Sequence, residues 1–71
     1  MIIDYDPNVD ALNITFRKGK VERTIELEYE INLDMDASGR PISLEVLGAK
    51  DKFGEKDFSK VQLHNLEAVT S

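Results

Sequence analysis

The chain has 71 residues, of which 9 are Lys or Arg and 14 are Asp or Glu, so its formal net charge is −5. It has no cysteine, which excludes disulfides, iron–sulfur ligation and a thiol nucleophile. The acidic balance argues against direct nucleic-acid binding, because Lys and Arg supply most of that affinity. Apolar runs do not exceed three residues, too short for a membrane span or a signal peptide, so we expect a cytoplasmic protein without membrane contact.

The small size of the chain favours association. A chain of this length buries only about 60% of the surface that it exposes when unfolded, and its stability is a small difference between large terms. No repeat or linker divides it, so we expect one domain over residues 1–71. We also expect this domain to form a homo-oligomer, namely a dimer, or to bind a partner protein.

The N-terminal part predicts a β-hairpin. Residues 1–5 are β-prone, and Asp6, Pro7 and Asn8 are typical of a turn. In residues 11–17 apolar and polar side chains alternate, which predicts a second strand. A polar connection containing Gly19 follows, and its composition suggests another hairpin into the next segment.

The clearest pattern covers residues 21–36. Odd positions are apolar apart from Arg23, and even positions are polar or acidic, which is typical of a strand with one buried face. Sixteen residues are long for one strand, so we expect a bend or bulge near residues 28–30. Each arm would then pair with a different neighbour.

The remaining elements complete an α+β, mainly β fold. Residues 37–41 contain Gly39 and predict a turn, and residues 42–48 alternate as a fourth strand. The four strands, over 1–5, 11–17, 21–36 and 42–48, suggest an antiparallel meander. Residues 49–54 predict a short helix that ends at Gly54. For residues 57–69 two alternatives compete, a helix capped by Asp57 and a fifth strand near 60–66.

Several short motifs carry a resemblance. They are Tyr5-Asp6, Asp10-Ala11-Leu12, Asp34-Met35-Asp36 with Gly39, and residues 42–49. Together they resemble domain-of-unknown-function family 2283, a set of small prokaryotic proteins, over about residues 1–50. The resemblance implies a compact β-rich domain without an assigned activity. Because some members are encoded beside toxin-like proteins, it also implies an antitoxin-like partner role.

The motif residues also have a purely structural interpretation. Asp6 and Asp10 are suited to hold the first hairpin turn through hydrogen bonds to the backbone, and Ala11 permits a close crossing. Asn13 departs from the family pattern, in which an aromatic residue is expected. We interpret the following motif residues as structural: Tyr5, Asp6, Asp10, Ala11, Leu12, Gly39 and Glu45.

One motif suggests a metal site. Asp34, Asp36, Ser38, Gly39 and Glu45 occupy positions 1, 3, 5, 6 and 12 of the calcium-loop pattern, with Ser38 as the mismatch. Both flanks alternate with period 2, whereas a calcium loop of this kind lies between helices. A calcium or other divalent metal site at Asp34, Asp36, Ser38 and Glu45 is therefore our alternative hypothesis, beside a plain strand end and hairpin turn.

Acidic residues recur along the long segment. On one pleated face they would form a row that attracts a basic partner protein, with Glu22, Glu26, Glu28 and Glu30 as the binding residues. The other interpretation is a solvated face that discourages aggregation. The whole row is Glu22, Glu26, Glu28, Glu30, Asp34 and Asp36.

The sequence offers little for catalysis. His64 is the only histidine, no serine lies in a nucleophile elbow, and no glycine-rich loop could hold a phosphate. We therefore predict no catalytic residue and no cofactor, although an enzyme with a site between subunits stays open. Tyr29, Phe53 and Phe58 are the aromatic residues suited to cover an apolar sheet face or anchor an interface. Open sheet edges add a second route to association, so we predict a non-catalytic interaction module.

Overall fold

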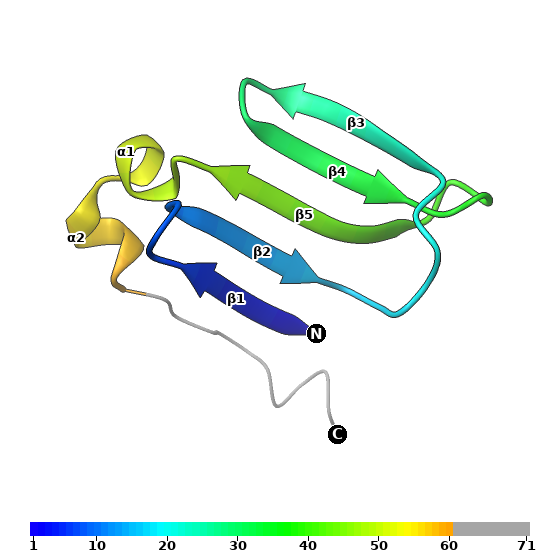
Figure 1. The fold of residues 1–71 in the computed structure, drawn as a ribbon, viewed down its shortest axis with the longest axis horizontal. Helices are drawn as coiled ribbons and strands as arrows, with labels where there is room; N and C mark the ends of the chain where they lie inside the picture. The colour runs from blue at the N-terminus through cyan, green and yellow to red at the C-terminus, as the bar shows by residue number, and fades with distance from the viewer. Residues whose placement is uncertain (61–71) are drawn as a thin grey trace.

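A computed structural model describes residues 1–60. One antiparallel sheet of five strands is followed by two short helices (Figure 1). The predicted fifth strand near 60–66 falls outside the described residues except for Lys60, as does most of the alternative helix over 57–69. The elements are β1 Ile2–Asp6, β2 Ala11–Thr15, β3 Arg23–Glu28, β4 Ile31–Met35, β5 Pro41–Leu47, α1 Ala49–Phe53 and α2 Glu55–Phe58.

The prediction of a mainly β, antiparallel fold with a short helix over 49–54 is confirmed. Within residues 1–60 no helix is long and apolar enough to cross a bilayer.

The order of the strands corrects the predicted meander. The sheet runs β1-β2-β5-β4-β3, so β2 pairs with β5 rather than with the strand that follows it in sequence. The turns between β3 and β4 and between β4 and β5 are short, and these strands pair as successive hairpins. One side of β5 then remains free, and β2 occupies it. Residues 16–22 therefore form a strap that runs from β2 past the ends of β5 and β4 to the edge strand β3 (Figure 1).

The strap is fixed to β5 and β4 by backbone contacts. The amides of Phe16 and Arg17 both donate to the carbonyl of Ile42, and the amide of Glu22 donates to Met35. Gly19 lies directly over the Ile42 side chain: a Cβ at this position would be 2.6 Å from Ile42 Cδ1. Any larger residue here would force the end of the Ile42 side chain to shift, so glycine favours the close approach of the strap to the sheet.

The long segment bends at the predicted place but pairs differently. Tyr29 and Glu30 form the turn between β3 and β4, and Glu30 has a φ of 61°. The two arms pair with each other, and β4 also pairs with β5. The expectation of a separate neighbour for each arm is therefore wrong, because a two-residue turn brings the arms back side by side.

The cross-strand register divides the sheet into two chemically different faces. One row of directly opposed residues is Tyr5, Leu12, Val46 and Ile31, and the next is Ile3, Ile14, Leu44, Leu33 and Ile25. These rows form what we call the apolar face. The opposite face carries the row Asp4, Asn13, Glu45, Asn32 and Glu26, and we call it the polar face.

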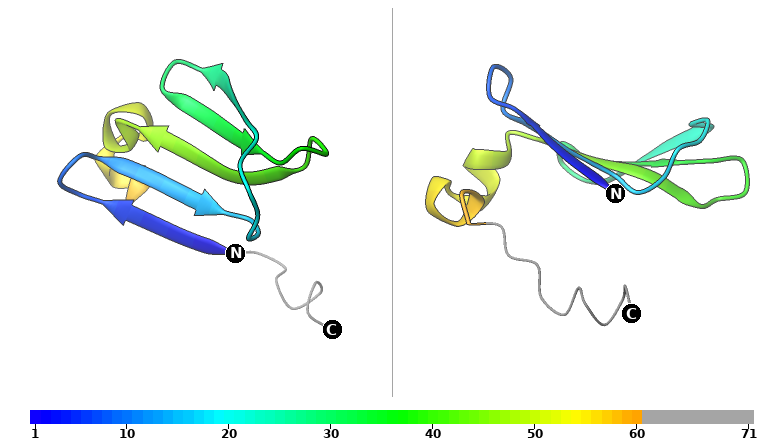
Figure 2. Two further views of the ribbon diagram at one scale, coloured as in Figure 1. Left: turned by 45° about the vertical axis from the view of Figure 1, so that its right-hand side comes forward. Right: turned by 90° about the horizontal axis from the view of Figure 1, so that it is seen from below.

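The helices lie on one side of the sheet only (Figure 2). This is the apolar face, because side chains of α1 and α2 line a groove together with Ile3, Leu12 and Ile14. The cover is partial: Ile25 remains 40% exposed and Leu27 59% exposed. The buried apolar side chains of the described residues are Ala11, Met35, Ile42, Val46 and Ala49.

Candidate interaction site

An open groove lies between the sheet and the helices. Its volume is about 730 Å³, and its walls are mostly apolar or aromatic. Two charged side chains, Lys52 and Asp57, lie among the lining residues. The full lining is Ile3, Tyr5, Leu12 and Ile14 from β1 and β2, with Lys52, Phe53, Asp57 and Phe58 from the helices. An apolar concavity with a few polar groups is the usual form of a binding site.

Asp10 fixes the helical wall of this groove. The Asp10 carboxylate accepts the backbone N–H of Lys50 at 3.0 and 3.2 Å, and the Asp10 carbonyl accepts that of Ala49 at 3.1 Å. The first N–H groups of a helix lack partners within the helix, and a carboxylate is favourable there. Asp10 thus caps α1 from 40 residues away, while Gly48 turns the chain into the helix with a φ of 63°.

Tyr5 completes this connection. Its hydroxyl donates to Asp10 Oδ1 at 2.6 Å, and its ring lies 4.6 Å from that of Phe58. The hydrogen bond to Asp10, with burial and the nearby carboxylates, raises the pKa of Tyr5 to about 12. The same bond, with the backbone N–H of Lys50, lowers the pKa of Asp10. Both shifts favour a neutral phenol bound to an ionised carboxylate.

Asp10 should therefore make the stability of the fold depend on pH in the acidic range. Because its pKa is lower in the folded chain than in the unfolded one, its contribution is complete above about pH 4 and is lost as the pH falls through the folded value. In Asp10→Asn, which tolerates the φ of 52° at this position, we expect a melting temperature several degrees lower at pH 7 and a shallower decline below pH 4.

Thermal melts of wild type, Asp10→Asn and Tyr5→Phe between pH 2.5 and 7 measure this. Tyr5→Phe keeps the ring against Phe58 and removes only the hydroxyl, so its loss at pH 7 should be the smaller one. An acid decline in Asp10→Asn as steep as in the wild type would contradict the assignment.

The other motif residues serve different parts of the fold. Asp6 accepts the amide of Asn8 at 2.9 Å, which holds the first hairpin turn as the sequence suggested. Asp10 holds α1 instead of its own turn. Ala11 is buried opposite Leu47, and Leu12 lines the groove. Gly39 turns the chain between β4 and β5 with a φ of 83°.

A second hollow continues the apolar face towards β3. It has a volume of about 360 Å³ and is lined by Glu28, Tyr29, Ile31, Lys52 and Phe53. Lys52 and Phe53 also line the groove, so the two hollows share one wall. Lys52 Nζ lies 5.4 Å from the centre of the Tyr29 ring, within range of a cation–π contact. Tyr29 itself is 74% exposed.

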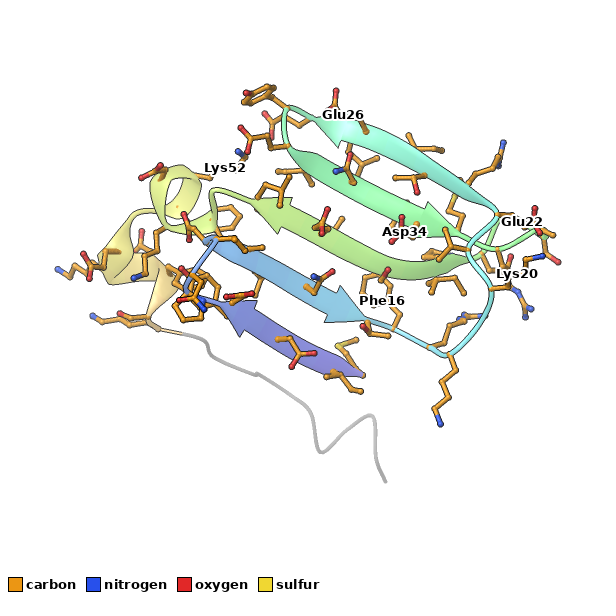
Figure 3. All side chains as sticks on the ribbon, in the orientation of Figure 1. Phe16, Lys20, Glu22, Glu26, Asp34 and Lys52 are labelled. Atoms are coloured by element: carbon orange, nitrogen blue, oxygen red, sulfur yellow. The ribbon has the colours of Figure 1, made fainter. Side chains whose placement is uncertain are left out.

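The predicted acidic row does not form one row. β3 and β4 are antiparallel, so Glu26 lies opposite Asn32, and Asp34 lies opposite Thr24. Figure 3 shows Glu22, Glu26 and Asp34 at separate places on this part of the sheet. A β-bulge between Glu26 and Glu28 places Glu28 beside Ile31, in the second hollow on the apolar face. Glu30 is in the turn, and Glu22 forms an ion pair with Lys20 at 3.6 Å before β3 begins.

The polar face nevertheless carries carboxylates from several strands. Asp4 and Glu45 flank Asn13, and Glu45 and Glu26 flank Asn32. The family departure at Asn13 therefore places an amide between two carboxylates. In the neighbouring row, Asp34 accepts hydrogen bonds from the Thr24 hydroxyl at 2.6 Å and from the Ser43 hydroxyl at 2.9 Å.

The four predicted metal ligands are not gathered at one site among residues 1–60. Asp36 accepts the amides of Ser38 and Arg40 in the turn, and its carboxylate forms an ion pair with Arg40 at 3.2 Å. These bonds and the guanidinium charge lower the pKa of Asp36. Asp34 is bonded to Thr24 and Ser43, and Glu45 lies on β5. No group of three or more His, Cys, Asp or Glu able to hold a metal ion occurs among residues 1–60.

Calcium titration by calorimetry at low salt tests the metal hypothesis. From the geometry we expect no binding heat and no change in melting temperature. Real binding would be easy to detect, because a ligand at 100 times its Kd stabilises the fold by about 2.7 kcal/mol. Asp34→Ala is the control for any heat observed. A calcium heat that Asp34→Ala abolishes would contradict this expectation and support the loop site.

The chain was compared with known proteins. No curated protein matches it, and no solved structure does. A family model described as "Protein of unknown function (DUF2283)" matches residues 2–50, from the first residue of β1 to Lys50, whose amide Asp10 accepts. The matched range covers well over half of the chain and includes every strand, so the protein belongs to the DUF2283 family.

Proposed function

We propose that this chain is a non-catalytic interaction module that buries its apolar face against another protein. The observation that carries the proposal is the incomplete cover of that face. From the groove to β3 it presents exposed apolar side chains, among them Leu27 and Phe53 at 59% and 46% exposure. Burial of apolar surface contributes roughly 25 cal/mol per Å² of favourable free energy, so a partner that covers this face would bind more tightly.

The residues at the two hollows have the character of interface anchors. Aromatic side chains dominate the energy of many protein interfaces, particularly where they frame a pocket. Phe53 forms the wall shared by both hollows, and Tyr29 lines the second. We infer that the groove receives an apolar side chain of the partner.

The polar groups of the groove support a binding role over a catalytic one. The hydroxyl of Tyr5, which lines the groove, donates to Asp10, and the Asp10 carboxylate accepts the Lys50 amide, so this pair is occupied in holding α1. With a pKa of about 12, the Tyr5 phenol stays protonated near neutral pH and is a poor general base.

A pair of matched double variants tests the proposal. Leu27→Glu with Phe53→Glu alters the apolar face, and Ile2→Glu with Val9→Glu makes the same change at exposed apolar residues outside it. Tagged proteins are isolated from the expressing cells, with circular dichroism to check folding. We expect the first pair to reduce the amount of partner protein that is isolated with the tagged chain at least 30-fold, and the second pair to leave this amount unchanged. Equal retention by both pairs would overturn the proposal.

A second candidate function uses the opposite face. Asp4, Glu26, Asp34 and Glu45 lie on the polar face, and β1, β2, β4 and β5 contain no Lys or Arg. This surface suits a basic protein, as an antitoxin-like role would require. Binding there should weaken at high salt and in Glu26→Gln with Glu45→Gln, and should survive the apolar-face variant. If the amount of bound partner changes neither at high salt nor in the glutamine variant, this candidate is excluded.

A further inference from the structure

β3 is an open edge of the sheet. It pairs with β4 on one side only, and every residue from Arg23 to Glu28 is exposed. Successive residues of a strand direct their backbone groups to opposite sides, so about half of the N–H and C=O groups of β3 point away from β4. Figure 1 shows no described element beyond it. Such an edge is a template for a further strand.

The two edges of the sheet differ in charge. β1, at the other edge, has two acidic residues and no basic one. β3 has Arg23 near its start and Glu26 and Glu28 near its end. When two copies of one strand pair antiparallel, the start of each lies beside the end of the other. For β3 this brings opposite charges together, whereas for β1 it brings only acids together.

We propose that two copies of the chain pair through β3, antiparallel and across a two-fold axis at Ile25, to form a continuous ten-stranded sheet. This proposal goes beyond the proposed function, because pairing at the edge joins the two apolar faces into one surface and leaves that surface open to another protein.

The register follows from the faces and the charges. Only registers that keep like faces together preserve the apolar face, because a slip of one residue moves every side chain to the other face. With Glu26 on the axis, two glutamates would lie directly opposite each other. With Thr24 on the axis, Glu22 would lie opposite Glu26 twice. With Ile25 on the axis, Arg23 lies opposite Leu27 and Thr24 opposite Glu26, so no like charges are directly opposed.

The β-bulge adds a favourable contact to this register. Without it, Glu28 would share a face with Glu26 and lie opposite Glu22 of the second copy. The bulge moves Glu28 to the apolar face, which also carries Arg23. Arg23 of each copy then lies next to Glu28 of the other, and symmetry makes the pair twice. The apolar faces of the two sheets join at Ile25 and Leu27.

Charge reversal tests the edge. Sedimentation equilibrium gives the dimer Kd for the wild type, Arg23→Glu, Glu28→Arg and the double variant. We expect each single reversal to raise the Kd at least tenfold, because it converts two attractions into two repulsions, and the double variant to return it to near the wild-type value. A purely structural loss would not be restored by the second reversal.

Single cysteines test the register, since the natural chain has none. A short bis-maleimide should link two copies best at Ile25→Cys, less at Thr24→Cys and Glu26→Cys, and not at Val9→Cys, which lies in the exposed β1–β2 turn. A maximum at residue 26 or at residue 9 would overturn the register.

The outcomes separate this inference from the proposed function. A monomer at all concentrations, or a dimer that the charge reversals leave unchanged, overturns pairing through β3. In either case the apolar-face variants still decide whether another protein binds the chain. A dimer that dissociates on reversal, recovers in the double variant and links at residue 25 supports the inference.

Discussion

Replacing Ile42 by alanine is expected to lower the free energy of unfolding by about 2–5 kcal/mol. Ile42 is only 5% exposed, and its side chain lies directly under the strap at Gly19. Truncation would leave a cavity that the strap cannot fill, because the amides of Phe16 and Arg17 hold the backbone at the Ile42 carbonyl. Domains of this size have about 4–10 kcal/mol in total, so the loss is a large share of it.

Urea denaturation followed by circular dichroism measures this loss. Ile2→Ala is the matched control, because Ile2 is 58% exposed on an edge strand and should lose well under 1 kcal/mol. The dependence on urea should keep the same slope in both variants. Equal losses in Ile42→Ala and Ile2→Ala would show that the strap does not close the core at Ile42.

Replacing Ala49 by leucine is expected to cost about 1–3 kcal/mol through overpacking. Ala49 is completely buried at the start of α1, and its amide donates to the Asp10 carbonyl. A larger side chain there would push α1 away from the sheet and strain the contact between Asp10 and Lys50. The melting temperature should fall by about 4–20 °C for a domain of this size.

Lys50→Leu is the control for this substitution, because Lys50 is the next residue and is exposed. It should leave the melting temperature within a few degrees of the wild type. Amide hydrogen exchange adds a local measure: the Lys50 amide, protected by Asp10, should exchange faster in Ala49→Leu. Unchanged protection of that amide together with an unchanged melting temperature would contradict the tight packing of α1.

The local pattern of the sequence predicted most of the elements. Alternation located the strands, Gly39 marked a turn, and Gly54 marked the end of α1. These features depend on neighbouring residues, for which periodicity and backbone preference are informative. Which strands lie side by side depends on contacts distant in sequence, and the alternation of β2 fits β3 and β5 equally well. The pairing of β2 with β5 could therefore not be predicted from it.

The candidate site was harder to predict for the same reason. Asp10 and Lys50 are 40 residues apart, and neither residue alone indicates that one caps a helix that begins beside the other. The only signal was that Asp10-Ala11 and Gly48-Ala49 both belong to the motifs that carry the family resemblance. The acidic row does not form because β3 and β4 fold back on each other, Glu30 lies in the turn between them, and the bulge moves Glu28 to the other face.

The most direct test of the account is site-specific photo-crosslinking in the expressing cells. A photoreactive phenylalanine analogue replaces Phe53, which lines both hollows of the apolar face, or Asn32, in the middle of the polar face. We predict covalent adducts of defined mass from position 53 and none from position 32. Adducts from position 32 alone, or none from position 53, would contradict the claim that this module works through its apolar face.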